Sequence, residues 1–212
     1  MTDTLVVDRP VIEAEDSAKR RQIVDGAREI FFARGFDAAS MGDIAKAAGV
    51  SKGTLYVYFK NKEELFSAIV QAECCTHAES VFGLDDNNHD VEATLTHVGV
   101  EFVNFLCRPE KASSIRIVSA IAERMPEIGK AFYETGPGNG IERVKAYLEA
   151  QVRAGVLEVG DCEVAAAQFL DACQSTMFKP VMFNFAPAPT PQRVRHVVGI
   201  AVAAFLAAYR KK

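Results

Sequence analysis

The sequence predicts an all-α protein of about nine helices, with a small N-terminal head followed by a larger helical body. Apolar residues recur three to four positions apart through most of the chain, which is the period of an amphipathic helix. β-branched residues are scattered and do not alternate with polar residues over the length of a strand, so no strand is expected. Clusters of glycine and proline separate the helical stretches.

The composition is that of a folded globular chain. Of 212 residues, 49% are hydrophobic and 25% are charged, which excludes general disorder. The longest apolar run, residues 197–209, is shorter than the roughly 20 residues that a membrane span needs. The N-terminus lacks the basic and apolar segments of a secretory signal. Five cysteines without a C-x-x-C pair fit a reducing compartment. We therefore expect a cytoplasmic protein with no membrane partner.

The first helix is expected to follow a flexible tail over residues 1–16, which show no periodicity. Ile23, Ala27 and Phe31 then share one helix face. Gly35 is expected to end this helix, because glycine readily takes the backbone conformation that closes a helix.

Two short helices are expected next. Ser40 can cap the first of them, with Asp43 three residues later as a variant of the capping box. Gly49 ends it, and Ser51 can cap the second, over 52–58. A long helix should follow from about residue 63 to 82. The remaining helices are expected at about 91–107, 111–124, 126–134, 140–154, 161–179 and 191–210.

Residues 40–62 carry the most specific pattern in the chain. Ala45 is small where two helices would cross, Gly49 permits a turn with positive φ, and Leu55 fills the space between the helices. This Ala-x3-Gly-x5-Leu spacing is typical of a helix-turn-helix, whose second helix enters the DNA major groove. The spacing alone would also fit a helical hairpin that does not bind DNA.

The second helix of this pair has surface chemistry suited to DNA. Lys52 can reach a phosphate or a guanine, Gly53 allows close approach, and Thr54 offers a hydroxyl and a methyl group. Lys62 begins the next helix, where a basic side chain and free N–H groups can bind a phosphate. The residues expected to contact DNA are Ser40, Ser51, Lys52, Gly53, Thr54, Tyr56, Tyr58 and Lys62.

The formal charge of −4 hides an uneven distribution. Residues 17–62 contain nine Lys or Arg and four Asp or Glu, a net charge of +5, so the remaining residues carry −9. An acidic average therefore does not oppose DNA binding by the head.

Residues 35–66 resemble the DNA-binding signature of the TetR family of bacterial regulators. The resemblance rests on Phe36, Ile44, Ala45, Ala48, Gly49, Val50, Ser51, Gly53, Leu55, Tyr56, Tyr58, Phe59, Lys62 and Leu65. Val57 departs from it, since several members carry tyrosine there, which removes one phosphate contact. More loosely, residues 124–137 and the helix from 161 resemble the AefR-like subgroup.

The resemblance implies a repressor that binds a palindromic operator in double-stranded DNA as a homodimer. It implies a helix-turn-helix DNA-binding domain at 17–64 and a ligand-binding and dimerisation domain at 65–212. Helices at about 161–179 and 191–210 would form the dimer interface. A small hydrophobic effector would release the operator. No catalytic set of residues and no metal or other cofactor is expected.

Aromatic and adaptable side chains in the body could line the effector pocket. At helical spacing the same residues are also typical of a plain core. The candidates are Phe102, Phe105, Phe132, Tyr133, Phe169, Cys173, Gln174 and Met177.

Two alternative functions stay open from the sequence. Cys74 and Cys75, with His77 on the same helix, could form a thiol or metal switch in a redox- or metal-responsive regulator. The protein could also activate transcription, because whether a regulator represses or activates depends on where its operator lies.

Overall fold

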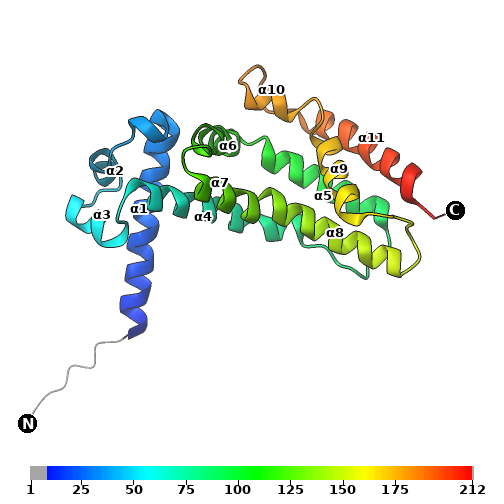
Figure 1. Ribbon diagram of the computed structural model, residues 1–212, viewed down its shortest axis with the longest axis horizontal. Coiled ribbons are helices and arrows are strands. Elements are labelled where there is room, and N and C mark those ends of the chain that lie inside the picture. Colours follow the sequence, from blue (N-terminus) through cyan, green and yellow to red (C-terminus); the bar gives the residue numbers. More distant parts are fainter. Residues whose placement is uncertain (1–8, 212) are drawn as a thin grey trace, which may run out of the picture. The chain divides into compact units, whose positions relative to one another are not determined.

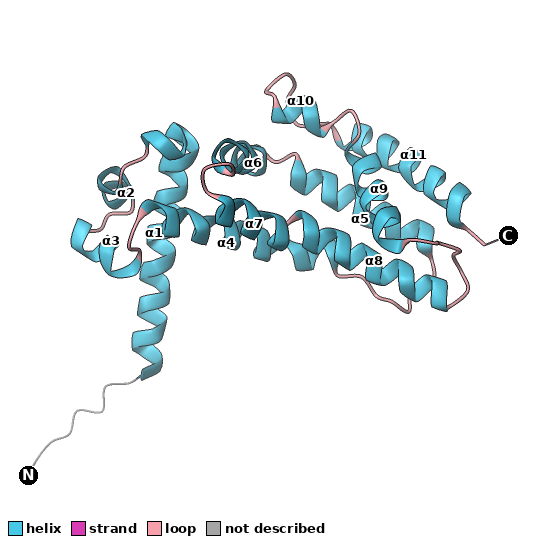
Figure 2. Ribbon diagram, viewed as in Figure 1, coloured by secondary structure: helices cyan, strands magenta, loops and turns pink. Residues whose placement is uncertain are grey.

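The computed structural model describes residues 9–211, and it describes their side chains outside 9–15, 71, 73–80 and 82. This part contains eleven helices and no strand, which confirms the all-α prediction (Figure 1; Figure 2). The chain forms two compact units, and the boundary between them falls between Ile69 and Val70, five residues after the expected one. Among the described residues, no helix is long and apolar enough to cross a membrane.

Helix α1 spans Arg9–Ala38, so it begins earlier than predicted. Residues 9–16, expected in the tail, are helical, and residues 1–8 lie outside the described part. Pro10 is tolerated in a first turn, and the glutamates and alanine that follow favour a helix, which explains the difference. Gly35 departs from helical geometry with φ 77° and ψ 173°, so the predicted break falls there.

Helices α2 (Met41–Ala47) and α3 (Lys52–Tyr58) begin at the predicted caps. Ser40 Oγ accepts the Asp43 N–H at 3.1 Å, and Ser51 Oγ accepts the Thr54 N–H at 3.0 Å. Each cap satisfies one of the N–H groups that a helix leaves unpaired at its start. Helix α4 follows at Lys62–Phe82.

The head has an aromatic core. The rings of Phe31, Phe36 and Phe66 lie with centroids 5.1–5.6 Å apart, and all three side chains are buried. Leu55 and Leu65 are fully buried, so α3 and α4 are each anchored in the same small unit. Such edge-to-face and offset pairs add to the free energy of burial.

The body contains seven further helices. Four of them begin with proline in the first turn, where the missing N–H costs no helical hydrogen bond. Helices α5, α9 and α11 pack against one another around a buried apolar core. The bounds are α5 Val91–Leu106, α6 Pro109–Ile121, α7 Pro126–Thr135, α8 Pro137–Arg153, α9 Cys162–Gln174, α10 Phe178–Met182 and α11 Pro191–Tyr209.

The predicted continuous helix at 161–179 is wrong. Helix α9 ends at Gln174, Thr176 takes a left-handed φ of 64°, and α10 begins at Phe178. Pro180 explains the break, because in a continuous helix its ring would clash with the carbonyl of residue 176 and its nitrogen could not donate to it. Within α10 the proline lies in the first turn, where it is tolerated.

Helix α11 has two different apolar faces. One face is buried and contains Val194, Val198 and Phe205. The other carries exposed small residues from Gly199 to Ala208, and Ile200 there is 59% exposed. A β-carbon added at Gly199 would meet no heavy atom within 4 Å. In a single chain this second face is therefore open.

Candidate nucleic-acid interface and ligand cavity

Helix α3 has a buried side and an open side. Leu55 is completely buried, which fixes the rotation of the helix in the head. Lys52 and Gly53 are exposed, Tyr56 is 52% exposed and Val57 is 81% exposed. The open face therefore presents a cation, a phenol and an isopropyl group together.

The turn between α2 and α3 is held by α1. Gly49 takes φ 63°, as the turn pattern requires. Gln22 donates through Nε2 to the Ala48 carbonyl at 2.6 Å. A β-carbon at Gly26 would lie 2.6 Å from both Ala48 Cα and Ala48 N. The backbone of α1 therefore lies directly against the backbone at the C-terminal end of α2. The orientation of α2, and through the turn that of α3, is thus set by direct contact with α1.

Neither packing nor backbone conformation within the head requires a glycine at position 53. A β-carbon there would meet only Ser51 Oγ, at an ordinary 3.7 Å, and its φ is not positive. Glycine costs a helix stability relative to alanine. The free space above Gly53 is what a DNA backbone or base edge would need for close approach.

Four of the hydroxyl groups that were predicted to contact DNA already have partners in the head. The Ser40 hydroxyl donates to Asp43 Oδ2 at 2.6 Å, and Ser51 Oγ lies 2.8 Å from Thr54 Oγ1. Tyr58 hydrogen bonds to Asp16, and this bond raises the pKa of the phenol. These groups therefore order the ends and the flank of α3.

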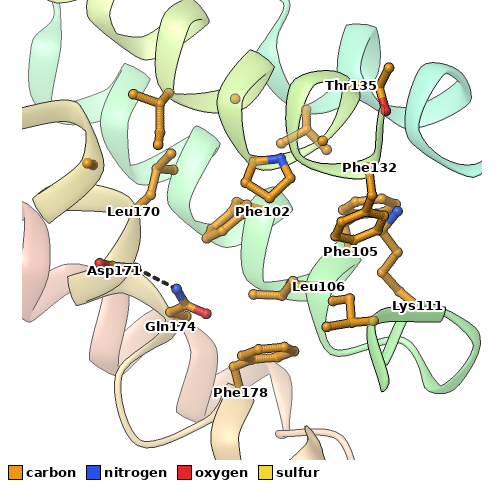
Figure 3. Close-up of a pocket in the computed structure, with 17 residues that line it drawn as sticks. Phe102, Phe105, Leu106, Lys111, Phe132, Thr135, Leu170, Asp171, Gln174 and Phe178 are labelled. Atoms are coloured by element: carbon orange, nitrogen blue, oxygen red, sulfur yellow. Dashed lines mark hydrogen bonds between the residues drawn. The ribbon is translucent and has the colours of Figure 1, made fainter. Parts of the chain in front are cut away.

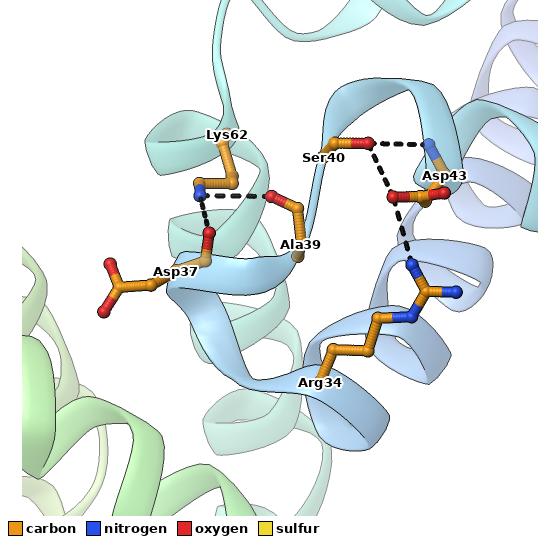
Figure 4. Close-up of polar contacts among 6 residues, drawn as sticks. All are labelled: Arg34, Asp37, Ala39, Ser40, Asp43 and Lys62. Atoms are coloured by element: carbon orange, nitrogen blue, oxygen red, sulfur yellow. Dashed lines mark hydrogen bonds and ion pairs between the residues drawn. The ribbon is translucent and has the colours of Figure 1, made fainter.

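Lys62 lies beside the loop between α1 and α2 (Figure 4). Its Nζ donates to the carbonyls of Phe36 at 2.8 Å and Ala39 at 3.1 Å, with Asp37 O at 3.4 Å. The same nitrogen lies 4.5 Å from the centroid of the Phe36 ring. Three carbonyls match the three N–H donors of an ammonium group. This geometry favours a positioning role for Lys62 over the predicted phosphate contact.

Asp43 joins α2 to the end of α1. Its carboxylate accepts the Ser40 hydroxyl and lies 3.1 Å from Arg34 Nη1. The hydrogen bond from Ser40, followed by the charge and hydrogen bond of Arg34, holds the pKa of Asp43 below its ordinary value. Arg34 is therefore also committed within the head.

The body encloses a cavity of about 280 Å³ (Figure 3). Its wall is mainly apolar and aromatic, with a few polar groups, which is the usual makeup of a small-molecule site. The wall is formed by segments from α4 to α10. Its lining residues include Val81, Phe102, Phe105, Leu106, Lys111, Phe132, Ile141, Leu170, Asp171, Gln174 and Phe178.

The structure brings some of the predicted pocket residues together and places others elsewhere. Phe102, Phe105, Phe132 and Gln174 line the cavity. The other four do not: Tyr133 is 58% exposed on α7, Phe169 packs edge-on against Phe205, and Cys173 and Met177 lie in the core.

Two comparisons with family models match the two units separately. Residues 23–69 match the model described as bacterial regulatory proteins of the TetR family. Residues 93–211 match that of the AefR-like transcriptional repressor, C-terminal domain, which covers more than half of the chain. The chain belongs to the TetR family. The predicted resemblance is confirmed for both parts.

Solved structures of TetR-family proteins share the fold over nearly the whole chain. A TetR-family regulator from Mesorhizobium loti MAFF303099 is 28% identical, with a TM-score of 0.85 and coverage of 92% of this chain and 98% of that one. The flavonoid-responsive regulator FrrA is 30% identical, with a TM-score of 0.77 and coverage of 92% and 99%. Both are transcription regulators by description, and this family is not one of enzymes.

Curated TetR-family relatives match over a shorter stretch. The regulator AcrR of Shigella flexneri is 46% identical over 57 residues, which are 27% of this chain and 26% of that protein. UidR of Escherichia coli K12 is 36% identical over 92 residues. The chain spans between about a quarter and half of the length of the curated relatives it matches.

Four of the five cysteines of this TetR-family chain fall into two groups. Burial raises the pKa of the Cys107 thiol to about 11 and that of Cys173 to about 12, so both act as small apolar groups. Cys74 and Cys75, the predicted alternative switch, lie outside the residues whose side chains are described. Among the side chains that are described, no cluster of three or more His, Cys, Asp or Glu could hold a metal ion.

Sequence reasoning missed several residues that matter in these two sites. Gln22 and Gly26 position the turn, and Lys111, Leu106 and Ile141 line the cavity. A helix-turn-helix pattern records only residues within the motif, so Gln22 and Gly26 carried no signal. Lys111 follows a proline at the start of a helix and reads there as an ordinary exposed lysine.

Proposed function

We propose that this protein is a ligand-responsive TetR-family repressor in the bacterial cytoplasm. It binds a palindromic operator as a homodimer, with α3 of each subunit in the major groove. A small, mainly apolar effector occupies the cavity of the body and releases the operator.

The open face of α3 is the observation that carries the proposal. Lys52 and Tyr56 supply hydrogen-bond donors, Gly53 admits the nucleic acid, and Val57 can contact the methyl group of thymine. Ser40, Ser51, Thr54 and Tyr58 hold this face in position through the hydrogen bonds described above.

The second face of α11 supports a homodimer. Gly199 and the alanines beyond it would allow the same helix of another subunit to approach closely, and Ile200 would be buried on contact. On α9, Val164 is 49% exposed and adds to this apolar surface. Two-fold symmetry of such an interface would match a palindrome whose half-sites lie about 34–36 Å apart.

Helix α4 supports the coupling of effector to operator. Val81 near its C-terminal end lines the cavity, and Lys62 at its start holds the end of α1 in the head. An effector lowers operator affinity only if it binds the DNA-incompetent arrangement more tightly. A molecule that displaces Val81 is therefore expected to act through α4.

The DNA proposal is tested by selecting binding sites from random duplexes and measuring affinity by fluorescence anisotropy. We expect a palindromic site and affinity that falls steeply with salt. Lys52→Ala combined with Tyr56→Phe should weaken binding about tenfold or more, since a good base contact contributes about 1–3 kcal/mol. The matched control is Lys130→Ala with Tyr133→Phe on α7, where both residues are exposed. Weak binding without sequence preference would refute the proposal.

The homodimer is tested by sedimentation velocity. The unaltered protein should sediment at the mass of two chains, and Ile200→Asp should convert it to one chain and abolish tight operator binding. Tyr133→Asp places the same charge on an exposed apolar residue of α7 and should leave the dimer intact. Sedimentation of the unaltered protein as a single chain would exclude dimerisation through this face.

A further inference from the structure

Polar side chains are few among the described residues of the cavity wall, which are Lys111, Thr135, Asp171 and Gln174 beside the apolar ones. The Thr135 hydroxyl donates to the Ala131 carbonyl at 2.6 Å, so its proton is already used. The Lys111 ammonium group lies over two aromatic rings of the wall and has a further partner within the protein. The pair that can recognise a ligand is therefore Asp171 and Gln174, one turn apart at the end of α9.

The orientation of the Gln174 amide is fixed by Asp171. Gln174 Nε2 donates to Asp171 Oδ1 at 2.8 Å. An ionised carboxylate can only accept hydrogen bonds, so the amide must turn its NH₂ group toward Asp171. The amide oxygen lies on the other side of the same planar group, and Figure 3 shows it pointing away from Asp171 into the cavity. Gln174 therefore presents a hydrogen-bond acceptor to a molecule in the cavity.

The surroundings of this acceptor are apolar. Phe102, Leu106 and Phe178 line the same cavity, and Figure 3 places them on the cavity side of Gln174. Gln174 is partly buried, whereas Asp171 is exposed. A hydrogen bond is stronger where water is excluded, and a polar group left there without a partner is costly. A ligand that donates to the Gln174 oxygen is therefore favoured over one of the same shape that does not.

We infer that the effector is an apolar ring compound with a neutral hydroxyl group, and that this hydroxyl donates to Gln174 Oε1. The inference rests on the proposed function, because it names the class of molecule that the same cavity takes. Gln174 contacts the effector, and Asp171 is a positioning residue that holds the amide. The ring of the effector packs against the aromatic side chains of the wall.

A neutral donor fits this position better than an ion does. An anionic oxygen has no proton to donate to Gln174 Oε1. An ammonium group would lose its hydration in a mainly apolar wall and would gain only a neutral acceptor there, because the charge of the exposed Asp171 is screened by water and salt. A hydroxyl group donates one hydrogen bond and carries no charge that must be desolvated.

The test compares 2-naphthol with 2-methylnaphthalene, whose methyl group replaces the hydroxyl at similar size, on the full-length protein. The chain has no tryptophan, so the fluorescence of the naphthalene ring reports binding directly. Gln174→Met should weaken 2-naphthol about threefold to tenfold, the loss typical of one hydrogen bond between neutral groups. It should not weaken 2-methylnaphthalene, because that molecule makes no bond to the amide.

The positioning role of Asp171 is tested on the same two ligands. In Asp171→Ala the Gln174 amide can turn either of its groups toward the cavity, so 2-naphthol should weaken by a smaller factor than in Gln174→Met. Asp171→Asn keeps an acceptor for the NH₂ group and should bind 2-naphthol more tightly than Asp171→Ala does. Glu163→Ala removes an exposed acid from the same helix and should change neither ligand.

Two outcomes overturn the inference. In one, 2-naphthol does not bind the unaltered protein, or binds it no more tightly than it binds Gln174→Met. In the other, Gln174→Met weakens both ligands equally, which would make the glutamine a packing element only. Asp171 is exposed, so Asp171→Ala keeps the inference testable even if Gln174→Met does not fold.

Operator binding is measured on the same preparations. A protein in which Gln174 selects the hydroxyl but which binds no specific operator would refute the proposed function and support the inference about the cavity. Specific operator binding without selection of the hydroxyl by Gln174 would overturn the inference alone.

Discussion

The head and the body position their functional groups in different ways. In the head, α1 touches the backbone of α2, and Lys62 binds three main-chain carbonyls within four residues of one another. In the body, residues from α4 to α10 form the cavity wall, and most of them carry apolar or aromatic side chains. The head thus holds one rigid shape against a regular partner, DNA, whereas side-chain walls can be altered for a new ligand without moving a helix.

Glycine substitutions should give the largest difference between the two units. A β-carbon at Gly26 would lie 2.6 Å from the backbone of Ala48, but at Gly99 it would meet side chains, Val198 Cγ1 at 2.7 Å and Cys173 Sγ at 2.9 Å. We expect Gly26→Ala to fall toward the upper end of the about 1–3 kcal/mol typical of overpacking and Gly99→Ala toward the lower end. Hydrogen exchange resolved by peptide measures the loss of stability in each unit separately. An equal loss at both sites would refute the distinction between backbone and side-chain contacts.

Replacing Lys62 should affect the stability of the head more than its affinity for phosphate. Lys62→Met loses the bonds to Phe36 and Ala39, and we expect a cost of about 1–2 kcal/mol in the head. The slope of operator affinity against salt concentration should stay the same. Lys60→Met removes an exposed neighbouring charge and serves as control. If stability is unchanged and the slope falls by about one, Lys62 contacts a phosphate after all.

Gly53 should separate folding from binding within the head. Gly53→Ala is expected to raise the free energy of unfolding, by at most about 1 kcal/mol, because alanine favours the helix and the added carbon meets only Ser51 Oγ, at an ordinary contact distance of 3.7 Å. Operator affinity should nevertheless fall. Gly160→Ala in the body adds a carbon with no atom within 4 Å and should leave operator affinity unchanged. Full operator affinity in Gly53→Ala would show that DNA does not approach this position closely.

The smallest effect is expected from Asp43 and depends on pH. Its pKa is lowered in the folded head, chiefly by the Ser40 hydroxyl. The stabilisation from its charged form is therefore complete above the ordinary pKa of 3.8 and is lost as the pH falls through the lowered value. Asp43→Asn should melt with a shallower dependence on pH in this acidic range. The same acid dependence in variant and unaltered protein would assign it to other carboxylates.

Local patterns predicted the head better than the body. Ser40, Gly49, Ser51 and Leu55 act within a few residues of one another, so their spacing in the sequence carries their roles. The cavity depends on which faces of distant helices meet, and periodicity does not encode this. Phe102 and Phe169 are both phenylalanines at helical spacing from other apolar residues. Phe102 nevertheless lines the cavity, whereas Phe169 packs against Phe205. Thr176 carried no signal for the break before α10, although Pro180 did.

The short helix α10 has a kinetic consequence for the cavity. Phe178 belongs to a five-residue helix that follows the break at Thr176, and Arg116 on α6 donates to the Met182 carbonyl at 3.1 Å. Short elements with few hydrogen bonds open locally at a lower free energy than long packed helices do. A ligand would therefore enter and leave past α10 more readily than past α5 or α8. The residence time of the ligand would then depend on the bond between Arg116 and the Met182 carbonyl.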